Sequence, residues 1–510
     1  MRLPYFWDEA GYYVPAARDV LLTGSLIPHS TLSNAHPPLV MAWLALWWKV
    51  VGYTPVVTRT AMLVLAAFSL LGVFRLAELV ANSRVAIAAT LCTAVYPVFF
   101  AQSSLAQVDL AAAGFILWGL SAYIEEQTLA TILWFSLAAL AKETAILAPV
   151  ALAAWEIVGR LARDISLRKL WTNTDEQRDN GTSVSLARRI SSLLIPALPL
   201  TLWYAYHYAR KGYVFGNPEF FRYNVAATLS PTRFVLTLIM RLWQVTGYLH
   251  LWILTSAMLI AMWMLPPLRD ASSERPRIRI PRQMFFYVVI FTYVITMSLI
   301  GGAVLARYML PAVPLIILVS VSTLWRRVRW WPAAIAFVAL ALVAGWFSNP
   351  PYGFSPEDNL AYRDYIVLHE NAEQFLEARY PMARVLTAWP ASDELTRPWL
   401  GYITRPMSTV RIEDFSLDEI LSAADFRSHY DAVLIFSTKY EPPPARWDHW
   451  QTWTKLKTKF FGFHRDLPPA AAAHILGGQI VFSQQRQGQW VAVIEMQQSE
   501  IQNAEAIMKK

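Results

Sequence analysis

The sequence predicts an α-helical polytopic membrane protein of about ten transmembrane helices, followed by a C-terminal extracytoplasmic α/β domain. Of the 510 residues, 55% are hydrophobic, 14% are aromatic and only 16% are charged, which is more apolar than soluble globular chains usually are. Apolar stretches near the length that crosses a hydrocarbon core of about 30 Å follow one another until about residue 350 and then stop. Arginines gather in the short connections between these stretches, as they do in membrane proteins.

The apolar stretches define the expected spans. Most are single crossings, and one longer block is predicted to form a helical hairpin with Lys142 and Glu143 at its tip. The single crossings are Thr60–Val80, Val85–Phe100, Leu110–Ile124, Ser191–Tyr208, Leu249–Leu265, Met284–Leu299, Leu310–Leu324 and Trp331–Trp346, and the hairpin is Leu129–Val158.

The positive-inside rule predicts the orientation. The arginine-rich connections, expected to be cytoplasmic, are residues 75–84, 160–189, 269–282 and 326–329. Because the chain crosses an even number of times between two such connections, the hairpin tip, residues 1–58 and residues 349–510 are all expected outside, on a bacterial inner membrane. An external N-terminus needs an insertion signal. Either this segment inserts together with the first hairpin or a transmembrane helix precedes Met1, and we expect the second.

The domain boundary is predicted at the Pro-rich break Ser348-Asn349-Pro350-Pro351. Residues 1–348 then form the transmembrane catalytic domain, with 1–58 as its first external loop, and residues 349–510 form the α/β domain. The single cysteine, Cys92, excludes an internal disulfide. Alternation predicts strands at Arg384–Trp389, Asp431–Phe436, Gln479–Ser483 and Gln489–Ile494, and helices are expected at Glu370–Arg379 and Ser416–Ala424.

The first external loop is predicted to carry two amphipathic helices in the outer membrane interface, where Trp and Tyr prefer to lie. The first covers residues 10–21 and stops before Gly24, and the second runs from Pro37-Pro38 to Gly52. Asp8 and Glu9 therefore open an interfacial helix.

Four ionisable residues are predicted at outer helix ends: Asp8, Asp109, Lys142 and Arg307. Each has a purely structural alternative. Asp8 and Asp109 have the position of helix N-caps, Lys142 that of an ion-pair partner of Glu143, and Arg307-Tyr308 that of an interfacial anchor. Together they supply a carboxylate to take a proton and cations to hold a phosphate, as transfer from a lipid-linked phosphate to a hydroxyl requires.

Several motifs resemble the polytopic GT-C glycosyltransferases over roughly residues 5–345. Within them the chain is most similar to the branch of the protein O-mannosyltransferases, the lipid A aminoarabinose transferases and the bacterial RgtA/B/C/D-like enzymes. The motifs are Trp7-Asp8-Glu9-Ala10-Gly11-Tyr12-Tyr13, Gly24-Ser25-Leu26-Ile27-Pro28, His36-Pro37-Pro38-Leu39 with Gly52, Gln107-Val108-Asp109, Ala141-Lys142-Glu143-Thr144, the loop Gly212–Phe220 and Arg307-Tyr308-Met309-Leu310-Pro311.

The resemblance implies transfer of a sugar from a polyprenyl-phosphate donor to an acceptor at the outer face of the membrane, commonly with inversion at the anomeric carbon. It implies Asp8 as catalytic base, with Glu9 beside it and Asp109 as the second acidic position. Lys142 and Arg307 are our candidates for contacts to the donor phosphate, with Tyr308 and His36 beside them. The aminoarabinose branch carries a lysine where His36 stands.

Other functions are disfavoured. The net charge of +8 comes from short connections and forms no nucleic-acid-binding stripe. The chain has no Walker loop or dinucleotide fingerprint, so a nucleotide sugar is not the expected donor. Carboxylates such as Asp8 and Asp109 suit a divalent cation, but no obligatory metal is expected because cationic side chains are available. The alternatives are a transporter or flippase of a lipid-linked glycan and a scaffold; the acceptor is left open between protein, lipid and glycan.

Overall fold

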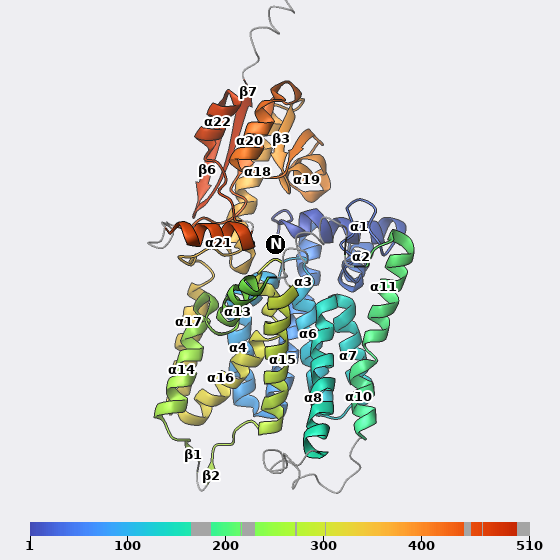
Figure 1. The fold of residues 1–510 in the computed structure, drawn as a ribbon, viewed down its shortest axis with the longest axis vertical. Coiled ribbons are helices and arrows are strands. Elements are labelled where there is room, and N and C mark those ends of the chain that lie inside the picture. The colour runs from blue at the N-terminus through green and yellow to red at the C-terminus, as the bar shows by residue number, and fades with distance from the viewer. Residues whose placement is uncertain are drawn as a thin grey trace, which may run out of the picture. The chain divides into compact units, whose positions relative to one another are not determined.

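The structure is a computed structural model that describes residues 1–164, 185–214, 216, 230–270, 273–300, 302–442, 450–461 and 463–496. The chain divides into two compact units (Figure 1). The helical unit is Ala16–Ser348, and the sheet unit combines Met1–Pro15 with Asn349–Lys510. The first fifteen residues, which we expected to open the external loop of the membrane domain, therefore pack with the C-terminal part of the chain.

The helical unit consists of helices joined by short connections. Its described elements are α1 (Val14–Thr23, which begins in the sheet unit), α2 (Leu39–Val51), α3 (Pro55–Val80), α4 (Ser83–Val95), α5 (Pro97–Gln102), α6 (Asp109–Ile124), α7 (Thr128–Ala141), η2 (Glu143–Ile146), α8 (Leu147–Asp164), α10 (Leu186–Leu194), α11 (Ala197–Lys211), α13 (Pro231–Thr246), η5 (Tyr248–His250), α14 (Leu251–Met264), β1 (Arg269–Asp270), β2 (Ser273–Glu274), α15 (Ile280–Ile300), η6 (Ala306–Met309), α16 (Val313–Arg327) and α17 (Trp331–Ala344).

Within the described residues, three helical segments are long and apolar enough to cross a membrane: Pro55–Val80, Pro231–Met264 and Ile280–Ile300. The second of these is kinked, because Leu249 and His250 have positive φ angles of 45° and 69° between α13 and α14. Further apolar helices are shorter, at 10–17 residues: Leu39–Val51, Ser83–Val95, Asp109–Ile124, Thr128–Ala141 and Trp331–Ala344.

Proline explains why some expected spans are shorter. The stretch Val85–Phe100 is divided into α4 and α5 at Tyr96-Pro97, and Ser191–Tyr208 is divided into α10 and α11 near Pro196. A proline lacks the amide donor that a continuous helix would need there. The expected hairpin is α7 followed by α8, with Lys142 and Glu143 in the turn between them.

Close packing of α3, α6 and α7 fixes the start of α6, where Asp109 lies. A Cβ on Gly114 would lie 2.1 Å from Ser69 Oγ of α3, and one on Gly119 would lie 2.8 Å from the Phe135 ring of α7. Small residues at these crossings let apolar helices approach closely. Helix α6 is thereby held on two sides.

The sheet unit contains a mixed five-stranded sheet of order β4-β3-β5-β7-β6 within its described residues. Strand β3 is parallel to β4 and β5, whereas β5 with β7 and β7 with β6 are antiparallel. The elements are η1 (Glu9–Tyr13), η7 (Pro356–Asp358), α18 (Ala361–Arg379), β3 (Arg384–Ala388), α19 (Ala391–Thr396), η8 (Pro398–Leu400), β4 (Ser408–Ile412), α20 (Leu417–Ala424), η9 (Arg427–His429), β5 (Ala432–Phe436), α21 (Gln451–Phe461), α22 (Pro469–Leu476), β6 (Gly478–Arg486) and β7 (Gln489–Met496).

The predicted strands are all present, and β4 is a strand that we did not predict. The β6–β7 hairpin turns at Gln487-Gly488, both with positive φ, as two-residue hairpins require. Helix α20 begins as expected, because the Ser416 hydroxyl accepts a hydrogen bond from Glu419 N. Helix α18, of which only the second half was predicted, packs on β6 and β7.

Candidate active site

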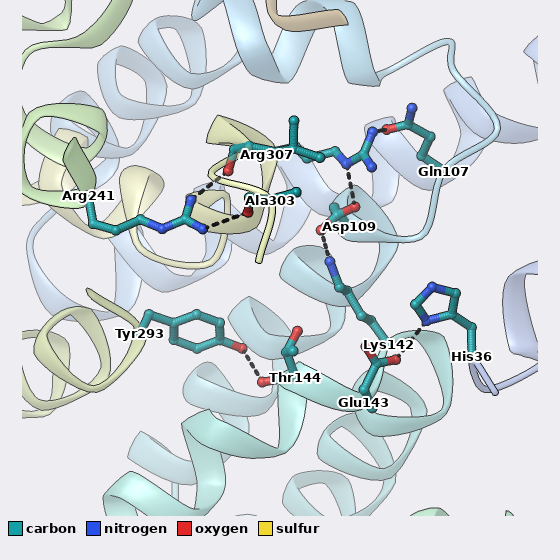
Figure 2. Close-up of polar contacts among 11 residues, drawn as sticks. His36, Gln107, Asp109, Lys142, Glu143, Thr144, Arg241, Tyr293, Ala303 and Arg307 are labelled. Atoms are coloured by element: carbon teal, nitrogen blue, oxygen red, sulfur yellow. Dashed lines mark hydrogen bonds and ion pairs between the residues drawn. The ribbon is translucent and has the colours of Figure 1, made fainter. Parts of the chain in front are cut away.

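A buried ion cluster in the helical unit brings together three of the predicted site residues (Figure 2). Lys142 Nζ is ion-paired with Asp109 Oδ1, and Arg307 Nε lies 3.2 Å from Asp109 Oδ2. Asp109 opens α6, Lys142 lies between α7 and η2, and Arg307 is in η6, so separate elements supply the three groups. All are buried, with exposed fractions of 3%, 6% and 2% in the order named. A carboxylate placed between two cations offsets part of the cost of burying them.

The structural alternatives for Asp109 and Lys142 do not match the geometry. Asp109 is the first residue of α6 and its N-cap is Val108, so Asp109 is not the cap. Lys142 pairs with Asp109, whereas its neighbour Glu143 lies 3.1 Å from Nδ1 of His36. The cluster therefore holds its charges through partners distant in sequence.

The ring of Tyr308 lies beneath several cations. Lys142 Nζ is 3.8 Å from the ring centroid, and the guanidinium carbons of Arg241 and Arg307 are 5.5 and 5.6 Å away. An aromatic face attracts cations electrostatically, and this attraction is stronger where water is excluded. Tyr308, predicted beside the donor phosphate, is thus part of the same cluster.

Arg241 and Gln244 on α13 hold the chain segment that leads into Arg307. Arg241 donates hydrogen bonds to the carbonyls of Leu305, at 2.7 Å, and Ala303, at 3.2 Å. Gln244 Nε2 donates to the carbonyl of Val304 at 2.9 Å. Sequence analysis missed both residues, although a fully buried arginine in an apolar helix is itself a signal of function or of a specific partner.

Gln107 and His36 occupy the edges of the cluster. Arg307 Nη1 donates to Gln107 Oε1 at 2.7 Å, which gives the guanidinium a second anchor. His36, just before α2, reaches the cluster through Glu143, the residue after Lys142. Figure 2 shows the contact of His36 with Glu143 and that of Lys142 with Asp109, and Glu143 directly follows Lys142 in the chain.

Asp8 and Glu9, the other two predicted site residues, belong to the sheet unit. Glu9 is fully buried, and its Oε2 accepts a hydrogen bond from Phe6 N at 2.9 Å. Asp8 is partly exposed and precedes η1, but its carboxylate makes no capping hydrogen bond. Glu9 is thus engaged with the backbone, while Asp8 is not acting as the cap that its position allowed.

Aromatic packing holds the segment that carries Asp8. Phe6 and Trp7 contact the ring of Tyr365, with centroids 5.1 and 5.5 Å apart, and Trp7 also contacts Trp389 at 5.2 Å. Gly11 lies so close to the Trp389 ring that a Cβ would come within 2.4 Å of it. Residues from both ends of the chain thus position this carboxylate.

Both oxygens of Asp109 face cations, so this carboxylate is not arranged as a ligand for a divalent ion.

The predicted motif loop Gly212–Phe220 is described only in part, because Phe215 and Asn217–Phe220 lie outside the described residues. Tyr213 of this loop donates a hydrogen bond to the Ser33 carbonyl at 3.1 Å, which ties it to the loop before His36.

Sequence comparison points to one family. The family model of dolichyl-phosphate-mannose-protein mannosyltransferases matches residues 35–174, a range that contains His36, Asp109 and Lys142. A comparison with curated proteins gave no match.

Comparison with solved structures finds the same overall fold in ArnT from Cupriavidus metallidurans. ArnT from Cupriavidus metallidurans bound to undecaprenyl phosphate is 13% identical, with a TM-score of 0.54, and the match covers 96% of this chain and 94% of that chain. The apo state of the same protein is 12% identical, with the same TM-score and coverage. The archaeal oligosaccharyltransferase AglB from Archaeoglobus fulgidus, solved with an inhibitory peptide and a dolichol-phosphate, is 11% identical, with a TM-score of 0.45 over 96% of this chain and 70% of that chain.

The resemblance to the GT-C superfamily is therefore confirmed. The chain has the fold of a GT-C glycosyltransferase, in which a mostly helical part with apolar helices is followed by a sheet-containing domain.

Proposed function

We propose that this protein is a membrane glycosyltransferase that moves a sugar from a polyprenyl-phosphate donor to an acceptor hydroxyl at the outer face of a bacterial cytoplasmic membrane. One observation carries the proposal. The buried carboxylate of Asp109 pairs with both Lys142 and Arg307, and Arg241 lies on the same Tyr308 ring. Cations gathered at one buried site suit a departing phosphate.

The residues divide the reaction between them. Asp8 takes the proton from the acceptor hydroxyl, whose oxygen then bonds to the anomeric carbon of the sugar. The bond from that carbon to the phosphate oxygen breaks, and the lipid phosphate leaves with the bonding electrons. Lys142 and Arg307 stabilise the phosphate, and Asp109 keeps both cations in place.

The fold relative supports the choice of donor class, since ArnT from Cupriavidus metallidurans was solved with undecaprenyl phosphate. The family model that matches residues 35–174 describes enzymes that use a sugar linked to a dolichyl phosphate. We extend the lipid carrier, and not the sugar or the acceptor, to this protein. The acceptor hydroxyl belongs to a protein, a lipid or a glycan of the cell envelope.

The experiment measures turnover of radiolabelled undecaprenyl-phosphate sugars by the purified full-length protein, with envelope extract as the acceptor source. Asp8→Asn should lower the rate about 10²–10⁴-fold, the usual contribution of a general base. It should leave binding of undecaprenyl phosphate unchanged. Asp418→Asn, which changes an exposed aspartate on α20 of the same unit, is the matched control.

Two results would overturn the proposal in different ways. Unchanged turnover by the Asp8→Asn variant would remove Asp8 as the base but keep the enzyme. Absence of turnover with every donor, together with movement of a labelled lipid-linked sugar across proteoliposomes, would make the protein a flippase.

A further inference from the structure

A second buried cluster, His369, Glu373 and Glu394, lies in the sheet unit and takes no part in the proposed reaction. His369 and Glu373 are one helical turn apart on α18, and Glu394 is on α19. His369 Nδ1 lies 2.7 Å from Glu394 Oε2 and 3.7 Å from Glu373 Oε1. The exposed fractions are 1% for the histidine and 0% for both glutamates.

The cluster buries more negative charge than its own groups can satisfy. Among the residues that the structure describes, no hydrogen-bond donor reaches either oxygen of Glu373 or Oε1 of Glu394. The Tyr365 hydroxyl, 3% exposed, is also without a hydrogen-bond partner in the described part of the chain. Its ring is stacked on the His369 imidazole at 3.9 Å. Buried carboxylates without partners are costly, so a missing positive partner is indicated.

We propose that His369, Glu373 and Glu394 bind one divalent transition-metal ion, with Zn²⁺ as the best chemical match. Each residue offers one ligand atom, and these atoms lie within 4.8 Å of one another. The measured separations of 2.7 and 3.7 Å bracket the about 3.4 Å expected between ligands of a tetrahedral Zn²⁺ with bonds of about 2.0–2.2 Å.

Charge favours a divalent ion over a proton. Two carboxylates and a neutral imidazole are neutralised by a doubly charged cation, whereas one shared proton leaves a net negative charge.

The expected role is structural, because no bulk water reaches these side chains. The ion would join α18 to α19. Tyr365, one turn before His369, packs on Phe6 and Trp7, the residues immediately before Asp8. A metal at this site would therefore stiffen the support of the segment that carries the proposed base.

The test measures the metal content of the full-length protein, purified through a tag that needs no metal and without chelators, by inductively coupled plasma mass spectrometry. We expect close to one Zn²⁺ per chain. Glu373→Gln keeps the side-chain volume but removes an anionic ligand, and should lower the content about tenfold or more. Glu370→Gln, at the less buried residue that directly follows His369 on α18, is the matched control and should keep the metal.

Thermal unfolding provides a second measurement that does not depend on glycosyl transfer. A strong chelator should lower the melting temperature of the wild type, added Zn²⁺ should restore it, and the Glu373→Gln variant should respond to neither. If the wild type contains no metal after incubation with Zn²⁺, the proposal is wrong. In that case we expect Glu373→Gln to keep the wild-type melting temperature, because its amide would donate where a protonated Glu373 does.

Discussion

The two units each bury an ionisable cluster, and the clusters have opposite composition. In the helical unit, Asp109 faces Lys142 and Arg307, so cations are in excess. In the sheet unit, Glu373 and Glu394 face His369, so carboxylates are in excess. Burying a charge without a partner is costly, so each cluster favours a ligand of the opposite sign. In the two proposals above, the ligand of the first cluster is the donor phosphate and that of the second is a metal cation.

The largest expected effect comes from removing the carboxylate that pairs with both Lys142 and Arg307. Asp109→Asn leaves Lys142 and Arg307 buried without their counter-charge, which should cost about 3–5 kcal/mol of unfolding free energy. Thermal unfolding in detergent measures it. Asp270→Asn, which removes an exposed carboxylate paired with Arg275, is the control and should not change the melting temperature. Equal effects of both variants would mean that the Asp109 cluster is not charge-stabilised.

The next effect concerns the excess of positive charge. Lys142→Met keeps an unbranched apolar chain but removes one cation, and should weaken binding of undecaprenyl phosphate about 10–100-fold, or about 1.4–2.8 kcal/mol. Titration of the purified protein with undecaprenyl phosphate measures this. Lys49→Met, an exposed lysine on α2, should bind like the wild type. An unchanged Kd for the Lys142→Met variant would separate the cluster from the donor.

The next prediction tests whether the segment that carries Asp8 depends on its packing against Trp389 in the same unit. Gly11→Ala places a methyl group 2.4 Å from the Trp389 ring, and overpacking of this kind costs about 1–3 kcal/mol. Tryptophan fluorescence should report the change, since Trp7 and Trp389 are in contact. Gly353→Ala is the control, because nothing lies within 4 Å of its added Cβ. No shift in fluorescence or stability would show that the segment tolerates displacement.

The smallest expected effect concerns a half-buried histidine, His464, which like His369 lies near two carboxylates. His464 lies 3.6 Å from Asp414 and 3.4 Å from Asp466, so it also has two carboxylates, but it is 31% exposed and Lys439 is nearby. The hydrogen bond with Asp466 raises the pKa of His464. Its contribution, under about 1 kcal/mol, is complete below about pH 6.5 and is lost as the pH rises through the raised value.

The corresponding measurement is melting temperature between pH 5.5 and 9. His464→Gln should flatten the part of this profile above pH 6.5 without changing metal content, and His429→Gln, an exposed histidine of the same unit, should not. Loss of metal in the His464→Gln variant would contradict the assignment of the ion to His369.

Sequence patterns were sufficient where the determinant is local. Apolar runs with a polar turn predicted the α7–α8 hairpin around Lys142, and alternation predicted β3, β5, β6 and β7. The short strand β4 was missed: it lies at the sheet edge and pairs only with β3 among the described strands, so burial imposes a weaker pattern on it.

Which side chains pair with each other could not be predicted, because the partners are brought together only by the tertiary structure. Nothing near Glu143 in the sequence indicates that it pairs with His36 instead of Lys142. The same holds for Arg241, which donates to Gln244 on its own helix but also to two backbone carbonyls more than sixty residues away. The helix boundaries at Pro97 and Pro196 show that a proline inside an apolar run predicts the end of a helix better than the length of the run does.

The packing of Met1–Pro15 with Asn349–Lys510 has a consequence for biogenesis. The ribosome makes Asp8 first, but the aromatic residues that fix it, Tyr365 and Trp389, emerge only after most of the chain has been synthesised. At translation rates of about 5–20 residues per second, this interval is on the order of 20–80 s. A nascent chain interrupted before that point carries the helical unit without the aromatic partners of the Asp8 segment. If Asp8 is the base that we propose, activity begins only after Trp389 has been made.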